Sequence, residues 1–357
     1  MKRVAVIGSQ GVPAKYGGFE TLVENIIGRH CGKDVEYTVF CSAKDMDSSL
    51  SSYKGASLRY IPLRAHGLQS VPYDIMSMMD ACQGYDTILI LGTSGAIFLP
   101  FLKLFTFKRK RIIVNIDGLE HERPKWTPTI KRFLRFCLAS CIRWADEIVS
   151  DNKGIQDYVR EHYGREARLI AYGGDHAIRN INNRRQQAIL DFYGLKKDEY
   201  ALSICRIEPE NNCDLTLETF RESGRPLVFI GNWDNSDYSK ELFRKYKGVK
   251  GFKLLNAIYD LDILFAIRNN CRLYVHGHRA GGTNPSLVEM MFFGKPILAF
   301  DVVYNRCTTQ DTAYYFKDRE QLAQLISRTD LDGSRSRQIA NAQYIWRDIA
   351  RQYEALY

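Results

Sequence analysis

The chain has 357 residues, a hydrophobic content of 45%, a formal net charge of +9 and nine cysteines. This length is typical of two domains that each bury a core, and this apolar content excludes a disordered chain. The cysteines are odd in number and form no C-x-x-C pair, which argues against a disulfide framework and a zinc site. We expect a protein of the reducing cytosol, because the sequence enters its first strand without an apolar signal region.

The first half of the chain alternates apolar strands with helical segments, which is the pattern of a mostly parallel sheet. The predicted strands are 3–7, 36–40, 57–61, 87–91, 111–116, 147–150 and 168–172, with helices from about 19, over 74–82 and over 129–145. The apolar run 87–105 is interrupted by Gly92, Gly95 and Pro100. These residues favour a strand, a loop and a buried helix over a membrane span.

A long turn with two adjacent glycines, Gly17 and Gly18, follows the first strand. The turn lacks the G-x-G-x-x-G spacing of dinucleotide-binding proteins, which disfavours NAD. Either glycine alone is also explained by ordinary loop chemistry. Together they would let a sugar or a diphosphate approach the backbone closely.

Two aspartates, Asp117 and Asp151, follow the predicted strands 111–116 and 147–150. Ligands of doubly wound sheets bind at the carboxyl ends of the strands, so both side chains are placed to meet a substrate hydroxyl. Each aspartate alone is also explained as a helix cap. His121 lies in the same segment as Asp117, and it is either a further site residue or a structural histidine.

The second half of the chain begins after a polar run, 179–187, which is the candidate domain boundary. Its predicted strands are 200–205, 226–230, 273–275 and 296–300. Arg206 ends the first of them, and a guanidinium there suits a diphosphate. The C-terminal stretch 334–357 is predicted to be helical.

A glycine-containing loop, 279–284, joins the strand 273–275 to a short helix. Asn284 is expected to cap this helix, Pro285 to open it and Gly294 to end it. Amides of the loop and of the helix start can bind an anion, and Glu289, one turn later, suits ribose hydroxyls. A plain βαβ crossover would show the same spacing.

The segment VHGHRAGGTNPSLVEMMFFGKPILAFD, residues 275–301, resembles the donor-binding segment of retaining GT-B glycosyltransferases of family GT4. The N-terminal MKRVAVIGSQGVPAKYGGFETLVENI resembles a bacterial subgroup, with a DUF1972-type N-terminal domain, that adds rhamnose to surface polysaccharide precursors. The resemblance spans nearly the whole chain. It implies an α/β fold of the GT-B class, with two Rossmann-like doubly wound domains facing a central cleft.

The resemblance also implies how the domains divide the work. Residues 1–173 would bind the acceptor, residues 184–339 the nucleotide sugar, and a C-terminal helix at about 340–357 would pack back on the first domain. Asp117 and Asp151 would be the catalytic residues, with His121 and His278 as further candidates. The implied donor-binding residues are Gly17, Gly18, Arg206, Asn211, Gly281, Gly282, Thr283, Asn284 and Glu289.

This sequence departs from the GT4 pattern at two of those positions. Gly281 stands where the family commonly has a glutamate, so sugar contacts would come from amides, Thr283 and Asn284. Asn211 stands where a lysine is usual, which removes a positive charge from the diphosphate site. Asp260 and Asp262 form a D-x-D pair, but an apolar helical run follows them, so they are expected to begin a helix. No metal and no cofactor is expected.

The positive charge is concentrated in residues 101–143, where eleven Lys or Arg stand against three acids, a net charge of +8. Aromatic residues are interleaved with these charges, which suits an anionic membrane surface. The charge pattern predicts a peripheral protein of the inner face of the cell membrane. The resemblance implies a nucleotide sugar, dTDP-L-rhamnose, as donor and a polyprenyl-diphosphate-linked sugar as acceptor. The alternatives are a solvated charged face, a GT-B sugar-nucleotide epimerase and a basic nucleic-acid-binding protein, although no nucleic-acid module is recognisable.

Overall fold

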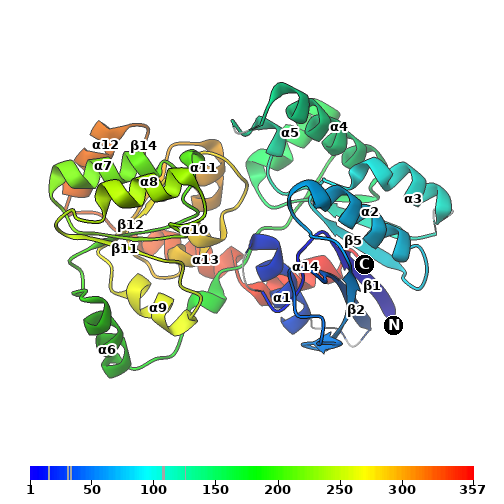
Figure 1. The fold of residues 1–357 in the computed structure, drawn as a ribbon, viewed down its shortest axis with the longest axis horizontal. Coiled ribbons are helices and arrows are strands. Elements are labelled where there is room, and N and C mark those ends of the chain that lie inside the picture. Colours follow the sequence, from blue (N-terminus) through cyan, green and yellow to red (C-terminus); the bar gives the residue numbers. More distant parts are fainter. Residues whose placement is uncertain (15–16, 30–31, 33, 107–108, 125) are drawn as a thin grey trace. The chain divides into compact units, whose positions relative to one another are not determined.

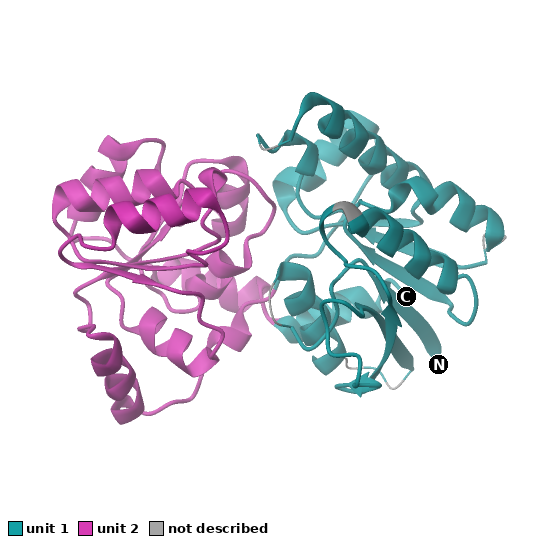
Figure 2. Cartoon of the chain, in the orientation of Figure 1, with its two compact units in different colours: residues 1–172, 346–357 teal, residues 173–345 magenta. Residues whose placement is uncertain are grey.

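The computed structural model describes the whole chain except residues 15–16, 30–31, 33, 107–108 and 125. The chain forms two compact units, shown in Figures 1 and 2. The first unit contains residues 1–172 and 346–357, and the second contains residues 173–345. Each unit is an α/β structure with its own sheet and its own buried core.

The sheet of the first unit has the strand order β3-β4-β2-β1-β5-β6-β7-β8, and every neighbouring pair except β3 and β4 is parallel. The strands are β1 Lys2–Ile7, β2 Val35–Ser42, β3 Ser52–Tyr53, β4 Ala56–Ile61, β5 Thr87–Leu91, β6 Arg111–Asn115, β7 Glu147–Ser150 and β8 Arg168–Leu169. The polar loop between β2 and β4 thus contains a short antiparallel strand that the sequence pattern did not indicate.

Helices cover this sheet, and the C-terminal helix is one of them (Figure 1). The helices are α1 Gly18–Arg29, α2 Ser70–Asp80, α3 Leu99–Phe105, α4 Pro128–Trp144, α5 Lys153–Tyr163 and α14 Trp346–Glu354, with 3₁₀ turns η1 Gly67–Gln69, η2 Ala96–Phe98 and η3 Glu120–Glu122. Trp346, Ile349 and Tyr353 of α14 are buried at helical spacing and join the same core as Val4 and Val39. The last helix of the chain therefore completes the core that the first strand begins.

The stretch 334–357 is helical, as predicted, but it is not one continuous helix. Two helices occupy the stretch, α13 Ser334–Gln343 in the second unit and α14 in the first. They are separated at Tyr344, whose hydroxyl donates to the Thr308 carbonyl at 2.8 Å. This bond keeps Tyr344 in the second unit, so the helix has to end before the chain returns to the first.

The sheet of the second unit is entirely parallel, with the order β11-β10-β9-β12-β13-β14. Its strands are β9 Ala201–Ile204, β10 Leu227–Ile230, β11 Phe252–Leu255, β12 Leu273–His276, β13 Ile297–Phe300 and β14 Tyr314–Phe316. Its helices are α6 Asn183–Tyr193, α7 Cys213–Ser223, α8 Asp237–Tyr246, α9 Leu261–Asn269, α10 Pro285–Met291, α11 Val303–Thr309, α12 Arg319–Ser327 and α13, with η4 Asp175–Ala177 and η5 Pro209–Asn211.

Helix α6 begins at Asn183, inside the polar run 179–187 that the sequence suggested as a domain boundary. Asn182 caps α6 by accepting a hydrogen bond from the Arg185 amide at 2.8 Å, and Gly194 ends it with a φ of 62°. Ile189 and Leu190 are buried, so one face of this polar helix is held by the unit's own packing. The chain enters the second unit earlier, at Gly173.

The apolar run 87–105 forms β5, η2 and α3, as expected, but α3 is not the buried helix that was predicted. Phe101, Leu104 and Phe105 are each more than half exposed. In the described part of the chain, no helix combines the length and the apolar character needed to cross a bilayer. The eight cysteines in that part are free thiols.

Candidate active site

The glycine loop between β12 and α10 is fixed to the loop that follows β9. Asn212 donates a hydrogen bond from Nδ2 to the Gly277 carbonyl at 2.8 Å, and the Arg279 amide donates to the Glu210 carbonyl at 3.0 Å. A Cβ atom at position 277 would lie 2.3 Å from the carbonyl oxygen of Asn211, so only glycine fits there. The two loops therefore stand together at the carboxyl edge of the sheet, where ligands of doubly wound folds bind.

Gly281, Gly282, Thr283 and Asn284 complete this glycine loop. Gly281 has a φ of 116°, a conformation that residues with a Cβ rarely adopt, and Gly282 and Thr283 are buried. Asn284 stands at the N-cap of α10, but its side chain makes no capping hydrogen bond, so that prediction was wrong. The backbone carbonyl of Asn284 accepts from the Leu287 amide at 3.0 Å instead.

Helix α10 begins with Pro285, as predicted, but it ends at Met291. The sequence placed its end at Gly294, which instead adopts a left-handed conformation with a φ of 62° after a further turn. Gly294 therefore marks where the chain leaves the helical turns and continues to β13. Glu289 lies in the last turn of this short helix.

The Glu289 carboxylate is held by two donors inside the second unit. Its Oε2 atom accepts a hydrogen bond from Nη2 of Arg268, and its Oε1 atom lies 3.2 Å from Nε2 of His176. The side chains of Arg268 and Glu289 are 4% and 13% exposed. Burial by itself raises the pKa of Glu289, but the charge of Arg268 and the hydrogen bond from His176 outweigh burial and lower this pKa to about 2. Glu289 is therefore ionised at neutral pH.

The sequence did not single out Arg268 or His176. Arg268 lies in the last turn of α9, next to the apolar run 263–267, and it is 3% exposed. A charged residue on the buried face of an apolar helix indicates that a partner of opposite charge is near. His176 lies on η4, a short turn that has no helical or strand periodicity. Its contact with Glu289 depends on tertiary structure alone.

Arg206 and Asn211 belong to the loop after β9. The Arg206 side chain is 45% exposed, and its Nη1 atom lies 3.7 Å from Oε1 of Glu208. Asn211 is buried, and its Nδ2 atom donates to the Arg206 carbonyl at 2.8 Å. Asn211 thus fixes the backbone that carries Arg206, and its contact with a donor stays a prediction.

His276 and His278 stack on one another at the end of β12, with ring centroids 4.1 Å apart and planes 9° apart. His276 is fully buried, and burial lowers its pKa to about 3. Asn305 of α11 donates to the His278 carbonyl at 3.0 Å. The role of His278 as a possible site residue stays a prediction.

In the first unit, Asp117 and Asp151 follow the neighbouring strands β6 and β7. The strands continue to pair past their ends, because the Ile116 amide donates to the Val149 carbonyl at 3.0 Å. Because β6 and β7 are parallel neighbours, the residues that follow them leave the sheet at the same edge. The structure therefore brings Asp117 and Asp151 to one region of the sheet edge.

Neither aspartate is a simple helix cap. Asn152, and not Asp151, caps α5, because its Oδ1 atom accepts from the Gly154 amide at 2.9 Å. Asp151 is 2% exposed. Asp117 has a φ of 54°, and such a left-handed conformation at a non-glycine residue is often found at functional sites.

Gly17 and Gly18 lie at the start of α1. Gly17 is next to the carboxyl group of Glu20, which the sequence analysis did not single out. A Cβ atom at Gly17, which has a φ of 114°, would lie 2.0 Å from Oε2 of Glu20. Glu20 is buried, and its Oε1 atom accepts a hydrogen bond from the Gln10 amide at 2.7 Å. Burial raises the pKa of Glu20 in spite of that bond. An acidic residue in a first helical turn resembles an ordinary N-terminal charge, which hid Glu20 in the sequence.

His121 lies on η3 and is buried, with Nε2 3.2 Å from the hydroxyl oxygen of Tyr158. Burial lowers the pKa of His121, and the nearby charges of Arg135 and Lys131 act in the same direction. A neutral imidazole is therefore favoured at pH 7. Its predicted role at the site stays a prediction.

The D-x-D pair begins a helix, as predicted. Oδ1 of Asp260 accepts hydrogen bonds from the amides of Asp262 and Ile263 at 2.8 and 3.0 Å, and Asp262 pairs with Arg179 at 2.9 Å. Among the described residues, no group of three or more His, Cys, Asp or Glu side chains is arranged to hold a metal ion.

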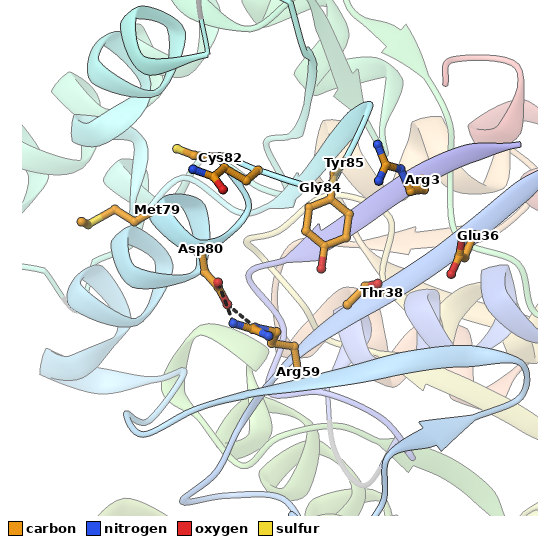
Figure 3. A pocket seen from close by; sticks show the side chains of 10 residues that line it. Arg3, Glu36, Thr38, Arg59, Met79, Asp80, Cys82, Gly84 and Tyr85 are labelled. Atoms are coloured by element: carbon orange, nitrogen blue, oxygen red, sulfur yellow. Dashed lines mark hydrogen bonds and ion pairs between the residues drawn. The ribbon is translucent and has the colours of Figure 1, made fainter.

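A cavity of about 610 Å³ lies on the first unit's sheet, near the amino ends of β1 and β2 (Figure 3). Arg59 and Asp80 line it and form a two-bond ion pair, with Nη2 of Arg59 2.8 Å from Oδ1 of Asp80. Arg3 and Glu36 contribute charges of both signs to the same wall. None of the candidate residues lines this cavity, because they follow the carboxyl ends of the strands.

Two α/β units with parallel sheets match solved GT-B glycosyltransferases over the full length of this chain. Sucrose-phosphate synthase from Thermosynechococcus elongatus is similar with a TM-score of 0.79 and 16% identity, covering 100% of this chain and 98% of that one. Anabaena HepE in complex with UDP-glucose gives 0.76 and 15% identity, covering 100% and 99%. The catalytic domain of starch synthase IV from Arabidopsis thaliana, bound to ADP and acarbose, gives 0.72 and 12%, covering 100% and 98%. The GT-B fold class is thereby confirmed.

Family models match the two halves of the chain separately. Residues 1–175 match a domain of unknown function, DUF1972, and residues 186–345 match glycosyl transferases group 1. The chain thus carries a DUF1972 domain followed by a glycosyl transferases group 1 domain. No curated protein sequence matches it.

Proposed function

We propose that this chain is a retaining glycosyltransferase that transfers a sugar from a nucleotide donor to a lipid-linked saccharide. The second unit binds the donor, and the first unit binds the acceptor. The observation that carries the proposal is the ionised Glu289, which lies on the helix that follows the glycine loop, in the same unit as Arg206. This combination provides a cation for a diphosphate and an anion for ribose hydroxyls.

Each group in the second unit meets a different part of the donor. Arg206 lies at the carboxyl end of β9 and binds the diphosphate oxygens through its planar guanidinium. Amides of the glycine loop, around Gly281 and Gly282, stabilise the same charge when the diphosphate leaves. No metal ion and no cofactor is required in this proposal, because protein cations and amides supply the positive charge.

Asp117 and Asp151 act on the acceptor in this proposal. They follow the neighbouring strands β6 and β7 at the carboxyl edge of the first unit's sheet. A carboxylate there can accept a hydrogen bond from the attacking hydroxyl and orient it toward the sugar. Replacement of either aspartate by asparagine should slow transfer and leave nucleotide binding in the second unit unchanged.

The donor in this proposal is dTDP-L-rhamnose, and the product belongs to a bacterial surface polysaccharide. Support comes from the resemblance of the N-terminal segment to rhamnosyltransferases. Anabaena HepE was solved with UDP-glucose, so that nucleotide sugar is the natural competitor. Titration calorimetry with dTDP-rhamnose, UDP-glucose, UDP-galactose and GDP-mannose should show binding of dTDP-rhamnose, and preference for another donor would refute the choice.

Transfer is tested with a radiolabelled donor and a polyprenyl-diphosphate-linked saccharide. We expect label to enter the lipid fraction only when enzyme and acceptor are both present. The variant Arg206→Ala should lose transfer, and Arg221→Ala, which removes an exposed arginine of α7, should retain it. Consumption of the donor without acceptor would instead favour an epimerase or a hydrolase.

A membrane-facing surface on α3 and α4 supports the lipid acceptor. Phe101, Leu104 and Phe105 of α3 are exposed, and so are Phe133 and Phe136 of α4. The two helices pack against one another, and α4 also carries Lys131, Arg132, Arg135 and Arg143. Exposed aromatic rings among cations are typical of proteins that lie on an anionic bilayer.

Not all of the basic residues in 101–143 contribute to this surface. Lys103 is buried and paired with Asp146, Arg123 pairs with Glu120 at 2.7 Å, and Arg111 pairs with Glu147 at 3.0 Å. Lys103 and Arg111 correct the simple charge count, because their partners Asp146 and Glu147 lie outside residues 101–143, whereas Glu120 was already subtracted in it. Lys108, Lys125 and Phe107 lie outside the described residues.

Liposome sedimentation tests this surface. The triple variant Lys131→Glu, Arg132→Glu and Arg135→Glu should bind anionic vesicles more weakly, since each basic residue contributes about 1 kcal/mol at such a surface. The variant Leu104→Ser with Phe105→Ser should also bind more weakly. A matched control is the charge reversal of Lys240, Arg244 and Lys247, which are exposed in the second unit. Equal sedimentation of parent and triple variant would refute the docking surface.

A further inference from the structure

The orientation of the Glu289 carboxylate is restrained at both of its oxygens, whereas a single ion pair would restrain only one. Arg268 approaches one oxygen from α9, and His176 approaches the other from η4. The two donors come from segments that are more than ninety residues apart in the chain. The carboxylate plane is therefore fixed from both sides, so that its remaining lone pairs have a set direction.

The segment that carries His176 is itself pressed against α10. A Cβ atom at Gly174 would lie 3.0 Å from the Glu289 amide nitrogen and 2.9 Å from Cγ1 of Val288. The Gly174 amide donates to the Tyr344 carbonyl at 2.9 Å, which ties the segment to the end of α13. His176 therefore cannot move away from Glu289 without disturbing this packing.

Arg268 and His176 act on the Glu289 carboxylate in different ways: Arg268 keeps it ionised, and His176 fixes its orientation. Arg268 is almost fully buried, and its Nε–H group donates no hydrogen bond to any of the described residues, so its Nη2 contact with Glu289 is its main electrostatic contact. A buried carboxylate without such a cation would bind a proton more readily and would become a hydrogen-bond donor at one oxygen. With Arg268 in place, Glu289 remains an acceptor only.

We propose that Arg268 and His176 are positioning residues that hold Glu289 as an oriented acceptor for the 3′-hydroxyl of the ribose or deoxyribose in the donor's nucleotide. This inference rests on the proposed function, because it requires that the second unit binds a nucleotide. Neither residue touches the ligand. Both act through Glu289, so their effect is specific to the one hydroxyl that Glu289 accepts from.

The test compares nucleotides that differ by that hydroxyl alone. ADP, GDP, UDP and dTDP are titrated calorimetrically, and the tightest is compared with its 3′-deoxy analogue. In the parent protein, loss of the hydroxyl should weaken binding roughly tenfold or more, as expected for a hydrogen bond to a charged acceptor. In Arg268→Met and His176→Phe, the ratio of the two affinities should fall toward one.

Two further variants separate positioning from folding. Arg268→Lys keeps a cation and should recover part of the discrimination. Arg268→Met combined with Glu289→Gln leaves no unpaired buried charge, so it should fold even if Arg268→Met alone does not. Its discrimination should be weaker than the parent's, because a neutral amide oxygen replaces the carboxylate. Arg221→Met on α7 is the control for removal of a paired arginine, and it should discriminate as the parent does.

The ratio distinguishes this inference from a structural role. A purely structural pair would weaken both nucleotides equally and leave the ratio unchanged. Parental discrimination in folded Arg268→Met and His176→Phe would therefore overturn the inference while leaving the proposed function intact, and parental discrimination in the double variant would also remove Glu289 from the donor site. Absence of binding by the parent to all four diphosphates would overturn both.

Discussion

Two largely buried carboxyl groups, Asp74 in the first unit and Glu289 in the second, have pKa values that are shifted in opposite directions. Asp74 accepts hydrogen bonds from the Ser94 hydroxyl at 2.8 Å and from the Gly95 amide, both neutral donors, and burial raises its pKa to about 7. Glu289 is also buried, yet Arg268 and His176 lower its pKa to about 2. Burial alone therefore does not determine the charge of a carboxyl group, because neighbouring cations and hydrogen-bond donors can reverse its effect on the pKa.

The largest effect on stability is expected from substitution of Glu289. Replacement of Glu289 by alanine leaves the Arg268 charge buried without its partner, and the free energy of unfolding should fall by about 3 to 5 kcal/mol. Urea unfolding of the second unit measures this loss. The variant that combines Glu289→Gln with Arg268→Met removes both charges and should unfold near the parental midpoint, and an equally unstable double variant would contradict the electrostatic explanation.

Asp74 should respond to pH in the opposite sense. Its folded pKa is raised, so between about pH 4 and pH 7 the unfolded chain has lost a proton that the folded protein keeps. Stability should therefore fall as pH rises through this window, by up to about 1.4 kcal/mol for each pH unit. The Asp74→Asn variant lacks this titration, so its stability relative to the parent should increase from pH 4 to pH 7. A constant difference between them would show that Asp74 titrates normally.

Glu289 sharpens the comparison at acid pH. Its folded pKa is depressed, so its contribution to stability is present above the unfolded value near 4.5 and is lost as pH falls toward 2. Unfolding midpoints of the parent should thus fall between pH 4.5 and pH 2 more steeply than those of the Glu289→Gln, Arg268→Met double variant. Parallel curves would mean that Arg268 does not hold the pKa of Glu289 down.

Arg206 offers the contrast of an exposed charge at the same edge of the sheet. Its side chain is 45% exposed, so Arg206→Ala should leave the unfolding midpoint unchanged. Calorimetry should nevertheless show that binding of a nucleoside diphosphate weakens by about 1.5 to 3 kcal/mol. Unchanged nucleotide affinity would remove Arg206 from the donor site.

The smallest effect is expected from a chelator. If protein cations and amides meet the charge of the diphosphate, transfer should proceed at the same rate in EDTA as in magnesium. Loss of turnover in EDTA, restored by manganese or magnesium, would mean that Arg206 and the glycine loop are not sufficient.

The sequence predicted the sheets better than the site. Apolar runs such as those of β5 and β12 identify strands by themselves, and Pro285 fixes the start of α10 through its own ring. The partners of Glu289 were missed because Arg268 and His176 are distant in the chain, and no local pattern links them to it. The burial of Asn211 was missed for the same reason, since it follows from the fit of two loops.

Because α14 is synthesised last, the core of the first unit can be completed only at the end of synthesis. The ribosome makes β1 first and α14 only after the entire second unit. Until Trp346, Ile349 and Tyr353 emerge, the apolar face that they cover in the core with Val4 and Val39 stays open to water. The half of the protein that is made first is therefore completed last, and the nascent chain presents an aggregation-prone surface throughout that interval, which chaperones would have to protect.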